Sequence, residues 1–323
     1  MTAPEADPQG RTPAGRVRFA TFNVLHGRPM RDGRPVPVPA GCRPQAPLVH
    51  AVASLDADVL ALQELDHVQE RSGRVDQARA AAEAAGTPYW RYASAFPAGP
   101  ATGPGRVPAP DGRELRLYGP GGLRQGAPGA GESVASYGIA LLSRLPVRHW
   151  RARRLAPAPV PVPLRTPGRR GLTVSRDEPR AALAAVLEGS RGPFTVVALH
   201  LSFVPGWNVR QLLAVRAWTA DLPGPHVLLG DLNLPGAIPG AVLNSPAWTG
   251  RRGSRRTRSG AAVPPPVRGW RDLARRPTYP AHRPLVRFDH VLAAGIEAGA
   301  ATGVNTPRTA VSDHRPLVVE LPL

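Results

Sequence analysis

The sequence predicts an α/β protein in which mixed β-sheets form a sandwich. Apolar, strand-like runs recur from residue 17 to the C-terminus, and segments with helical periodicity separate some of them. The alternation of strands and helices is irregular, which favours mixed sheets over a regular parallel barrel. Because 42% of the 323 residues are hydrophobic, the chain can build a sizeable core, and we expect one large domain.

The elements follow from local patterns along the chain. Helix formers, in one case followed by a Gly stop, predict helices over residues 48–55, 76–86 and 207–222. No internal repeat of the solenoid kind is found. Short apolar runs that end in polar residues or Gly/Pro turns predict strands over residues 17–23, 58–65, 137–147, 181–189, 194–202, 226–231, 283–293 and 315–323.

The segments outside this pattern are rich in Pro, Gly or charge. Residues 1–15 are polar and predict a disordered leader, so the domain is expected over residues 16–323. Flexible surface insertions are expected at about residues 97–131 and 250–266. The Pro-rich stretch 155–168 predicts a connecting loop at a sheet edge, with a polyproline ligand for a partner as the alternative.

The net charge of +18 owes its positive part to arginine, since the sequence contains no lysine. This charge favours an anionic partner such as nucleic acid, a phosphorylated small molecule or a lipid headgroup, but an arginine-rich composition explains it equally well.

The single Cys42 excludes an internal disulfide framework and a thiolate zinc cluster. No apolar run approaches the ~20 residues that span a bilayer, and we expect a cytoplasmic monomer without an obligate protein partner.

Several strand-like runs end in polar residues that can bind a metal or move protons. Taken singly, each such residue has a structural explanation, as an Asn or Asp in a turn, an exposed Glu or a core His. Taken together, carboxylates and amides suit Mg²⁺ or Mn²⁺, and histidines donate to phosphate oxygens, which predicts phosphoryl transfer in a shared crevice. These residues are Asn23, Glu64, His200, Asp231, Asn233, Asp313 and His314.

Six motifs carry a family resemblance. They are, in chain order, TFNVLHG, LALQELD, ALHLS, LLGDLN, RFDHVL and SDHRPL. From about Phe19 to the C-terminus the chain resembles the endonuclease/exonuclease/phosphatase family, and GDLN and SDH at this separation are specific when they occur together. The resemblance implies an α/β fold of four layers, in which two mixed β-sheets pack face to face with helices outside, as in DNase I-like proteins.

The resemblance also implies how a metal and a water molecule would be held. Glu64 would be the principal ligand of Mg²⁺ or Mn²⁺, and Asn23 and Asp313 would complete or support its shell. Asp231 and Asn233 would position and activate the attacking water.

Two histidines complete the implied site. His200 would donate to a phosphate oxygen, and His314 would be oriented by Asp289. Either Asp231 or the Asp289–His314 pair can remove the water proton, and the sequence leaves both open. Leu25 stands where the apurinic/apyrimidinic endonucleases of the family carry an acidic residue, which argues against close kinship with those repair enzymes.

Three further residues are weaker candidates for substrate contacts. His26 and Gln77 lie near the ends of motifs, where a loop or helix-cap role is the alternative. Arg180 can clamp a phosphate with two hydrogen bonds, although in an arginine-rich chain a solvated charge is the more ordinary role.

The sequence predicts a phosphodiesterase or nuclease, with a phospholipid or inositol-phosphate phosphoesterase of the same fold as the alternative. A non-catalytic module that binds anions or nucleic acid is the alternative from another class, but such a module would have lost some of the ligands that are present here.

Phe203 and Trp207 can form a rim for an organic leaving group, or they can simply pack in the core. A basic cluster without interleaved aromatics can follow a phosphate backbone, and it consists of Arg251, Arg252, Arg255, Arg256 and Arg258.

Overall fold

The computed structural model describes residues 15–97, 115–123, 135–164, 171, 173–246 and 267–323. Residues 1–14 of the predicted leader, the predicted insertion at 250–266 and the arginine cluster within it lie outside the described residues. Of the insertion predicted at 97–131, the described part forms two short strands at a sheet edge, β6 (Arg116–Gly119) and β7 (Gly122–Leu123).

The larger sheet has eight strands within the described ranges. Its neighbours β1 and β4 are parallel, and its other pairs are antiparallel. Its order is β17 (Thr302–Asn305), β18 (Leu317–Leu321), β1 (Val17–Asn23), β4 (Val59–His67), β8 (Ser136–Ser143), β5 (Tyr89–Pro97), β6 and β7.

The smaller sheet has six strands in the part of the chain that the structure describes. Its neighbours β13 and β14 are parallel and the rest are antiparallel, so both sheets are mixed. Its order is β15 (Arg271–Asp272), β16 (Asp289–Ala294), β14 (His226–Asp231), β13 (Gly192–His200), β12 (Arg180–Gly189) and β9 (Val147–Leu155).

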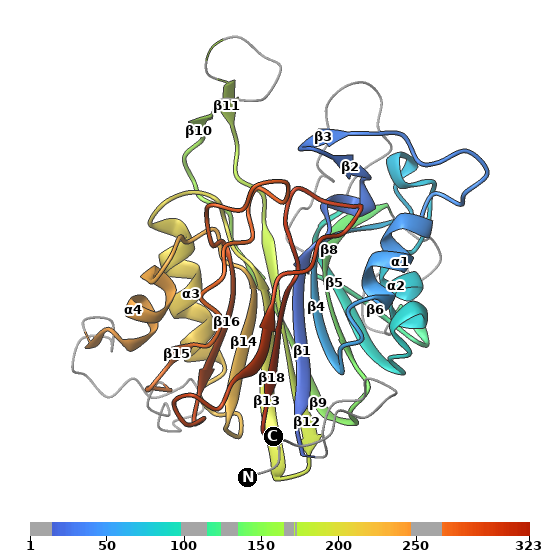
Figure 1. The fold of residues 1–323 in the computed structure, drawn as a ribbon. Helices are drawn as coiled ribbons and strands as arrows, with labels where there is room; N and C mark the ends of the chain where they lie inside the picture. The colour runs from blue at the N-terminus through green and yellow to red at the C-terminus, as the bar shows by residue number, and fades with distance from the viewer. Residues whose placement is uncertain (1–14, 98–114, 124–134, 165–170, 172, 247–266) are drawn as a thin grey trace.

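The two sheets pack face to face, and the helices cover their outer faces (Figure 1). Phe19 of β1 meets Phe194 of β13 edge to face, with ring centroids 6.2 Å apart, in the core between the sheets. α1 (Ala46–Ala53) and α2 (Gln77–Ala85) pack on the larger sheet, while α3 (Trp207–Trp218) and α4 (Ile238–Asn244) pack on the smaller one. The predicted four-layer α/β sandwich is therefore confirmed.

Local chemistry explains where the helices begin and end. In α2, Asp76 caps the N-terminus by accepting a hydrogen bond from the backbone N–H of Arg79, and Gly86 ends the helix with a left-handed φ of 62°. Each of the three predicted helices is present, with ends shifted by a few residues. Within the described ranges, no helix has the length and apolar character required to traverse a lipid bilayer.

Two predicted segments differ from the structure. The strand expected over 283–293 begins only at Asp289, because the preceding residues turn back on themselves and Val286 bridges to Tyr279. The Pro-rich stretch is not only a connecting loop, since it supplies β10 (Val162–Leu164), which pairs with β11 (Thr173–Ser175) in a projecting hairpin (Figure 1).

One edge of the sandwich collects strand ends from both sheets. The carboxyl ends of the parallel strands β1, β13 and β14 lie at this edge, and so do the amino ends of β12, β16 and β18. A small hairpin, β2 (Met30–Arg31) with β3 (Arg34–Pro35), lies at the same edge, whereas the C-terminus lies at the opposite edge (Figure 1). Side chains at these strand ends can therefore meet although they are far apart in sequence.

Candidate active site

Asp231 is the last residue of β14, and its buried carboxylate is the centre of the site. Its Oδ1 accepts a hydrogen bond of 3.0 Å from the backbone N–H of Asn233, and its Oδ2 accepts one of 3.0 Å from Asn23 Nδ2. Gly230 precedes it with a φ of +152°, and a Cβ at that position would overlap the carbonyl oxygen of Leu199 in β13. Glycine is therefore required for β14 to lie this close to β13 at the site.

Asn23 joins the two sheets at the site. It ends β1 in the larger sheet, and its Nδ2 donates to Asp231 Oδ2 of the smaller sheet and to Glu64 Oε1, at 3.0 Å in each case. Its Oδ1 accepts from the backbone N–H of Leu25 at 3.1 Å. One buried amide thus holds two carboxylates next to each other.

Glu64 lies inside β4 and not at the end of the strand that the sequence predicted. The pairing of β4 with β8 shifts register between Leu62 and Leu65, and Glu64 has a φ of +61° in this β-bulge. A bulge redirects one side chain out of the alternating pattern, and a positive φ is costly for a residue other than glycine. Leu62 and Leu65 stay in the core against the helices, while Glu64 reaches the site. Backbone strain such as the positive φ of Glu64 is typically found at functional sites.

His200 ends β13 and is oriented by Arg180, the first residue of β12. Arg180 Nη1 lies 3.2 Å from His200 Nδ1, and because a guanidinium only donates, Nδ1 is the acceptor. The Nε2 atom of the neutral ring then carries the proton, and it lies 3.7 Å from Asp231 Oδ2. Arg180 therefore fixes the tautomer of His200, a role that the sequence did not predict.

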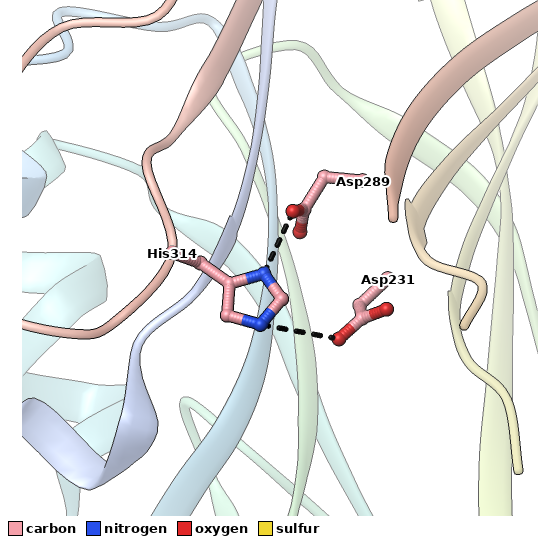
Figure 2. A group of neighbouring side chains, drawn as sticks. All are labelled: Asp231, Asp289 and His314. Carbon is pink, nitrogen blue, oxygen red and sulfur yellow. Dashed lines mark hydrogen bonds and ion pairs between the residues drawn. The ribbon is translucent and has the colours of Figure 1, made fainter. Parts of the chain in front are cut away.

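His314 is held by a buried carboxylate on its far side. Its Nδ1 donates to Asp289 Oδ2 at 2.8 Å, and Thr278 Oγ1 donates to the same oxygen at 2.6 Å. His314 Nε2 lies 3.9 Å from Asp231 Oδ2 (Figure 2). Both imidazoles thus face Asp231 Oδ2 at distances too long for direct hydrogen bonds.

Burial and neighbouring charge separate the protonation states of these groups. Burial lowers the pKa of His200 well below its usual value, and the positive charges of Arg180 and His314 lower it further. Burial opposes the charge on His314, but Asp289 and Asp231 outweigh it and raise the pKa of His314 to about 10. Burial likewise raises the pKa of Asp231 to about 6, against the attraction of His314.

The donor set fits a hard divalent cation. One oxygen of Asp231, one oxygen of Asp289 and a ring nitrogen of His314 lie within 4.8 Å of one another. Because His314 is held protonated, the ligands come from the carboxylates, to which Glu64 adds a half-buried one bonded to the same amide as Asp231. Asp289 Oδ1 is buried and has no hydrogen-bond partner among the described residues. Closely spaced buried carboxylates favour a cation, and their oxygen atoms suit Mg²⁺ or Mn²⁺ better than zinc.

Two predicted residues, Gln77 and Asn233, use their side chains for contacts other than those of this cluster. Gln77 is buried, accepts from the backbone N–H of Asp66 at 2.8 Å and donates to the carbonyl of His26 at 2.8 Å, so it holds the loop after β1 and is not exposed to substrate. Asn233 Nδ2 donates to the carbonyl of Leu201 at 3.0 Å. His26 follows Asn23 closely in the short helix η1 (Leu25–Gly27) and has a φ of 47°.

Asp313 immediately precedes His314, and its negative charge adds to those of Asp289 and Asp231 in raising the pKa of His314. Among the described residues, no hydrogen bond or ion pair joins its carboxylate to Glu64 or Asn23. Its negative charge is close enough to raise the pKa of Tyr279 together with burial, and it lines a neighbouring pocket. A hydrogen bond joins Asn23 to Glu64, while the place of Asp313 in the predicted metal shell stays a prediction.

Two residues that support the site were missed in the sequence. Ser312 Oγ donates to the carbonyl of Asn23 at 2.6 Å and accepts from the backbone N–H of His314 at 3.0 Å, so it ties the SDH loop to β1. Its place as the first residue of the SDHRPL motif could have identified it. Thr278, which bonds Asp289, lies in no motif, and only its contact in space identifies it.

The fold and the site together define a four-layer α/β sandwich with a metal-suited centre at the strand ends. The chain matches the family model "Endonuclease/Exonuclease/phosphatase family" over residues 20–314, and it belongs to this family. Family members are generally divalent-metal-dependent phosphoester hydrolases. No curated protein matches the chain significantly.

Solved structures of low sequence identity share the fold. An endonuclease/exonuclease/phosphatase from Beutenbergia cavernae is 19% identical, with a TM-score of 0.50 over 95% of this chain and 71% of that one. A family protein from Bacteroides thetaiotaomicron is 14% identical, with a TM-score of 0.51 over 95% and 97% of the two chains. One from Leptotrichia buccalis is 12% identical, with a TM-score of 0.51 over 94% and 99%. At these identities the likeness concerns the fold alone.

Proposed function

We propose that the protein is a Mg²⁺- or Mn²⁺-dependent phosphoester hydrolase that acts as a phosphodiesterase or nuclease. The observation that carries this proposal is the convergence of both sheets on Asp231, whose Oδ2 faces Asn23, His200 and His314. Such a site can bind a phosphate group between a cation and two imidazole donors.

Glu64 and Asn23 would hold the cation in this proposal, and Asp313 would support it from the adjacent loop. Asn23 would support the cation by holding the Glu64 and Asp231 carboxylates next to each other through its Nδ2. A bound divalent cation would neutralise charge that develops on the phosphate oxygens. The strained backbone of Glu64 supports this role, because it fixes the carboxylate at the site.

The remaining residues would handle the phosphate and the water. His200 Nε2–H, held in that tautomer by Arg180, would donate to a phosphate oxygen. His314, held by Asp289, would donate to another. We assign Asp231 as the base that takes the water proton, because its Oδ2 faces both imidazoles, and Asn233 as the residue whose backbone N–H holds that carboxylate.

The test is hydrolysis of bis(p-nitrophenyl) phosphate with Mg²⁺ or Mn²⁺. Glu64→Ala and His314→Ala should each lower kcat/KM by at least about a hundredfold, since each removes a group that binds the reacting phosphate. Glu83→Ala, which removes an exposed carboxylate from α2, is the matched control and should leave activity unchanged. Unchanged activity in both site variants would refute the assignment.

The substrate class is tested separately. The net charge of +18 supports nucleic acid, whereas sphingomyelin or an inositol phosphate is the alternative for the same site. Plasmid DNA, an abasic oligonucleotide, sphingomyelin and inositol phosphates would be compared side by side. Nicking of DNA that weakens steeply with salt supports the nuclease assignment, because phosphate contacts release counterions. Salt-insensitive activity confined to a lipid or small molecule would overturn it.

A further inference from the structure

A pocket of about 220 Å³ opens beside the candidate active site. We call it the arginine pocket, because Arg31, Arg308 and Arg315 line it together with His282, Asp32 and Asp313. Three permanent positive charges outnumber the two carboxylates of its lining.

The arginine pocket shares a wall with the site. Asp313 and Ser312 line it, and Ser312 holds both His314 and the carbonyl of Asn23. On its other side the β2–β3 hairpin is fastened to the C-terminal loop, since the backbone N–H of Met30 donates to the carbonyl of Ala310 at 2.9 Å. A substrate group that extends from the site over this wall would therefore enter a preformed pocket.

Arg308 has no carboxylate partner of the kind that two other arginines of the described chain have. Arg71 bonds Asp66 and Arg151 bonds Asp221, each through two nitrogen atoms. By contrast, the guanidinium of Arg308 makes no hydrogen bond or ion pair with any residue that the structure describes.

Arg315 adds a second cation close to Arg308. Its Nε donates to the carbonyl of Ala281 at 2.7 Å, which holds the side chain in place. Arg308 and Arg315 line the same pocket. Two guanidinium groups that line one pocket repel each other, and phosphate is an anion whose geometry both of them match.

We propose that the arginine pocket binds a second phosphate group of the substrate, next to the phosphate that is hydrolysed. This inference rests on the proposed function and narrows its substrate class to compounds that carry at least two phosphates. The second phosphate belongs either to the adjacent nucleotide of a strand or to a polyphosphorylated small molecule, and the two sources are separate arms of the test.

The kinetic test compares substrates with one and two phosphates. The two substrates with two phosphates are a 5′-phosphorylated thymidine dinucleotide and an inositol bisphosphate. For the one that the enzyme hydrolyses, Arg308→Gln should raise KM about tenfold, because a charged hydrogen bond to the second phosphate is lost. Its kcat, and its kcat/KM for bis(p-nitrophenyl) phosphate, should stay within about twofold of wild type. Arg308→Lys should restore most of the affinity, since it keeps the charge.

Arg275→Gln is the matched control, because Arg275 is also exposed but lines a different pocket, beside α4. It removes the same charge and should change neither KM. Equal effects of Arg308→Gln on substrates with one and with two phosphates, or the same effect from Arg275→Gln, would overturn the inference.

A binding measurement separates this inference from the proposed function. Titration calorimetry with inorganic phosphate in EDTA should show binding that Arg308→Gln weakens about tenfold, whether or not any substrate is hydrolysed. If hydrolysis fails but this dependence is found, the pocket stands and the proposed function falls. If hydrolysis is found and neither phosphate binding nor KM depends on Arg308, the pocket assignment falls.

Discussion

The two ends of β14 carry buried titratable residues in very different surroundings. At the first residue, His226 Nε2 lies 3.2 Å from the carbonyl of Thr219 and the ring packs near Trp270. At the last residue, Asp231 faces Asn23 and two imidazoles, from strands of both sheets. Between them, Val227 and Leu229 are buried in the core between the sheets, so one strand joins a purely structural end to a chemical one.

The comparison shows how this fold obtains reactivity. His226 is a neutral ring with one hydrogen bond, and burial alone lowers its pKa. Asp231 instead lies next to other ionisable side chains. Two histidines face it, and the amide of Asn23 links it to the carboxylate of Glu64. Burial raises the pKa of Asp231, so ionising this carboxylate costs folding free energy, and in the proposed function a bound cation would offset that cost.

The largest effect is expected from Asp231→Asn, which removes the charge at the chemical end. It should lower kcat by about 10²–10⁴-fold, because the proposed base is lost. Burial raises the pKa of Asp231, so its ionised form destabilises the metal-free fold above that pKa. In urea denaturation in EDTA at pH 7, the Asp231→Asn variant should therefore have a free energy of unfolding no lower than that of the wild type. Full activity, or a clear loss of stability, would remove the contrast between the two ends.

A smaller effect on activity is expected from Arg180→Gln. Arg180 is a positioning residue for His200, so kcat should fall about tenfold while KM stays nearly constant. Nitrogen chemical shifts of His200 should show the Nε2–H tautomer in wild type and a mixture in the variant. Arg151→Gln, which breaks a pair with Asp221 at the surface, is the control and should change neither. A wild-type ring that already carries its proton on Nδ1 would contradict the assignment.

The smallest effect is expected at the structural end of β14, from His226→Gln. Burial lowers the folded-state pKa of His226 below its usual value near 6.5, so the unfolded chain takes up the proton first as pH falls. The free energy of unfolding should thus decrease below about pH 6.5, by at most about 1.4 kcal/mol per pH unit for this residue. The variant should lose this share of the acid sensitivity, as measured by urea denaturation in EDTA between pH 7 and 5. Identical slopes would show that His226 does not titrate differently on unfolding.

The sequence predicted the strand ends of the site better than their surroundings. Asn23, His200 and Asp231 follow apolar runs, and local periodicity marks where such runs stop. Glu64 was found by its motif, yet its bulge depends on the pairing of β4 with β8, which no local pattern specifies.

The supporting contacts were beyond the reach of local patterns. Thr278 reaches Asp289, and Gln77 reaches the loop after β1, only because the chain returns to the same place in space. Arg180 was noticed as a cation, but its orientation toward His200 follows from the pairing of β12 with β13. Tertiary contacts of this kind decide which of many arginines and glutamines serve the site.

The most direct test of the account is a titration of the protein with Mn²⁺, followed by electron paramagnetic resonance. The account predicts a Mn²⁺ site whose dissociation constant rises at least about tenfold in Glu64→Gln, because a carboxylate ligand is lost. Glu83→Gln, on the exposed face of α2, should bind as wild type does. Equal Mn²⁺ binding by wild type and Glu64→Gln would contradict the claim that both sheets converge on a metal centre.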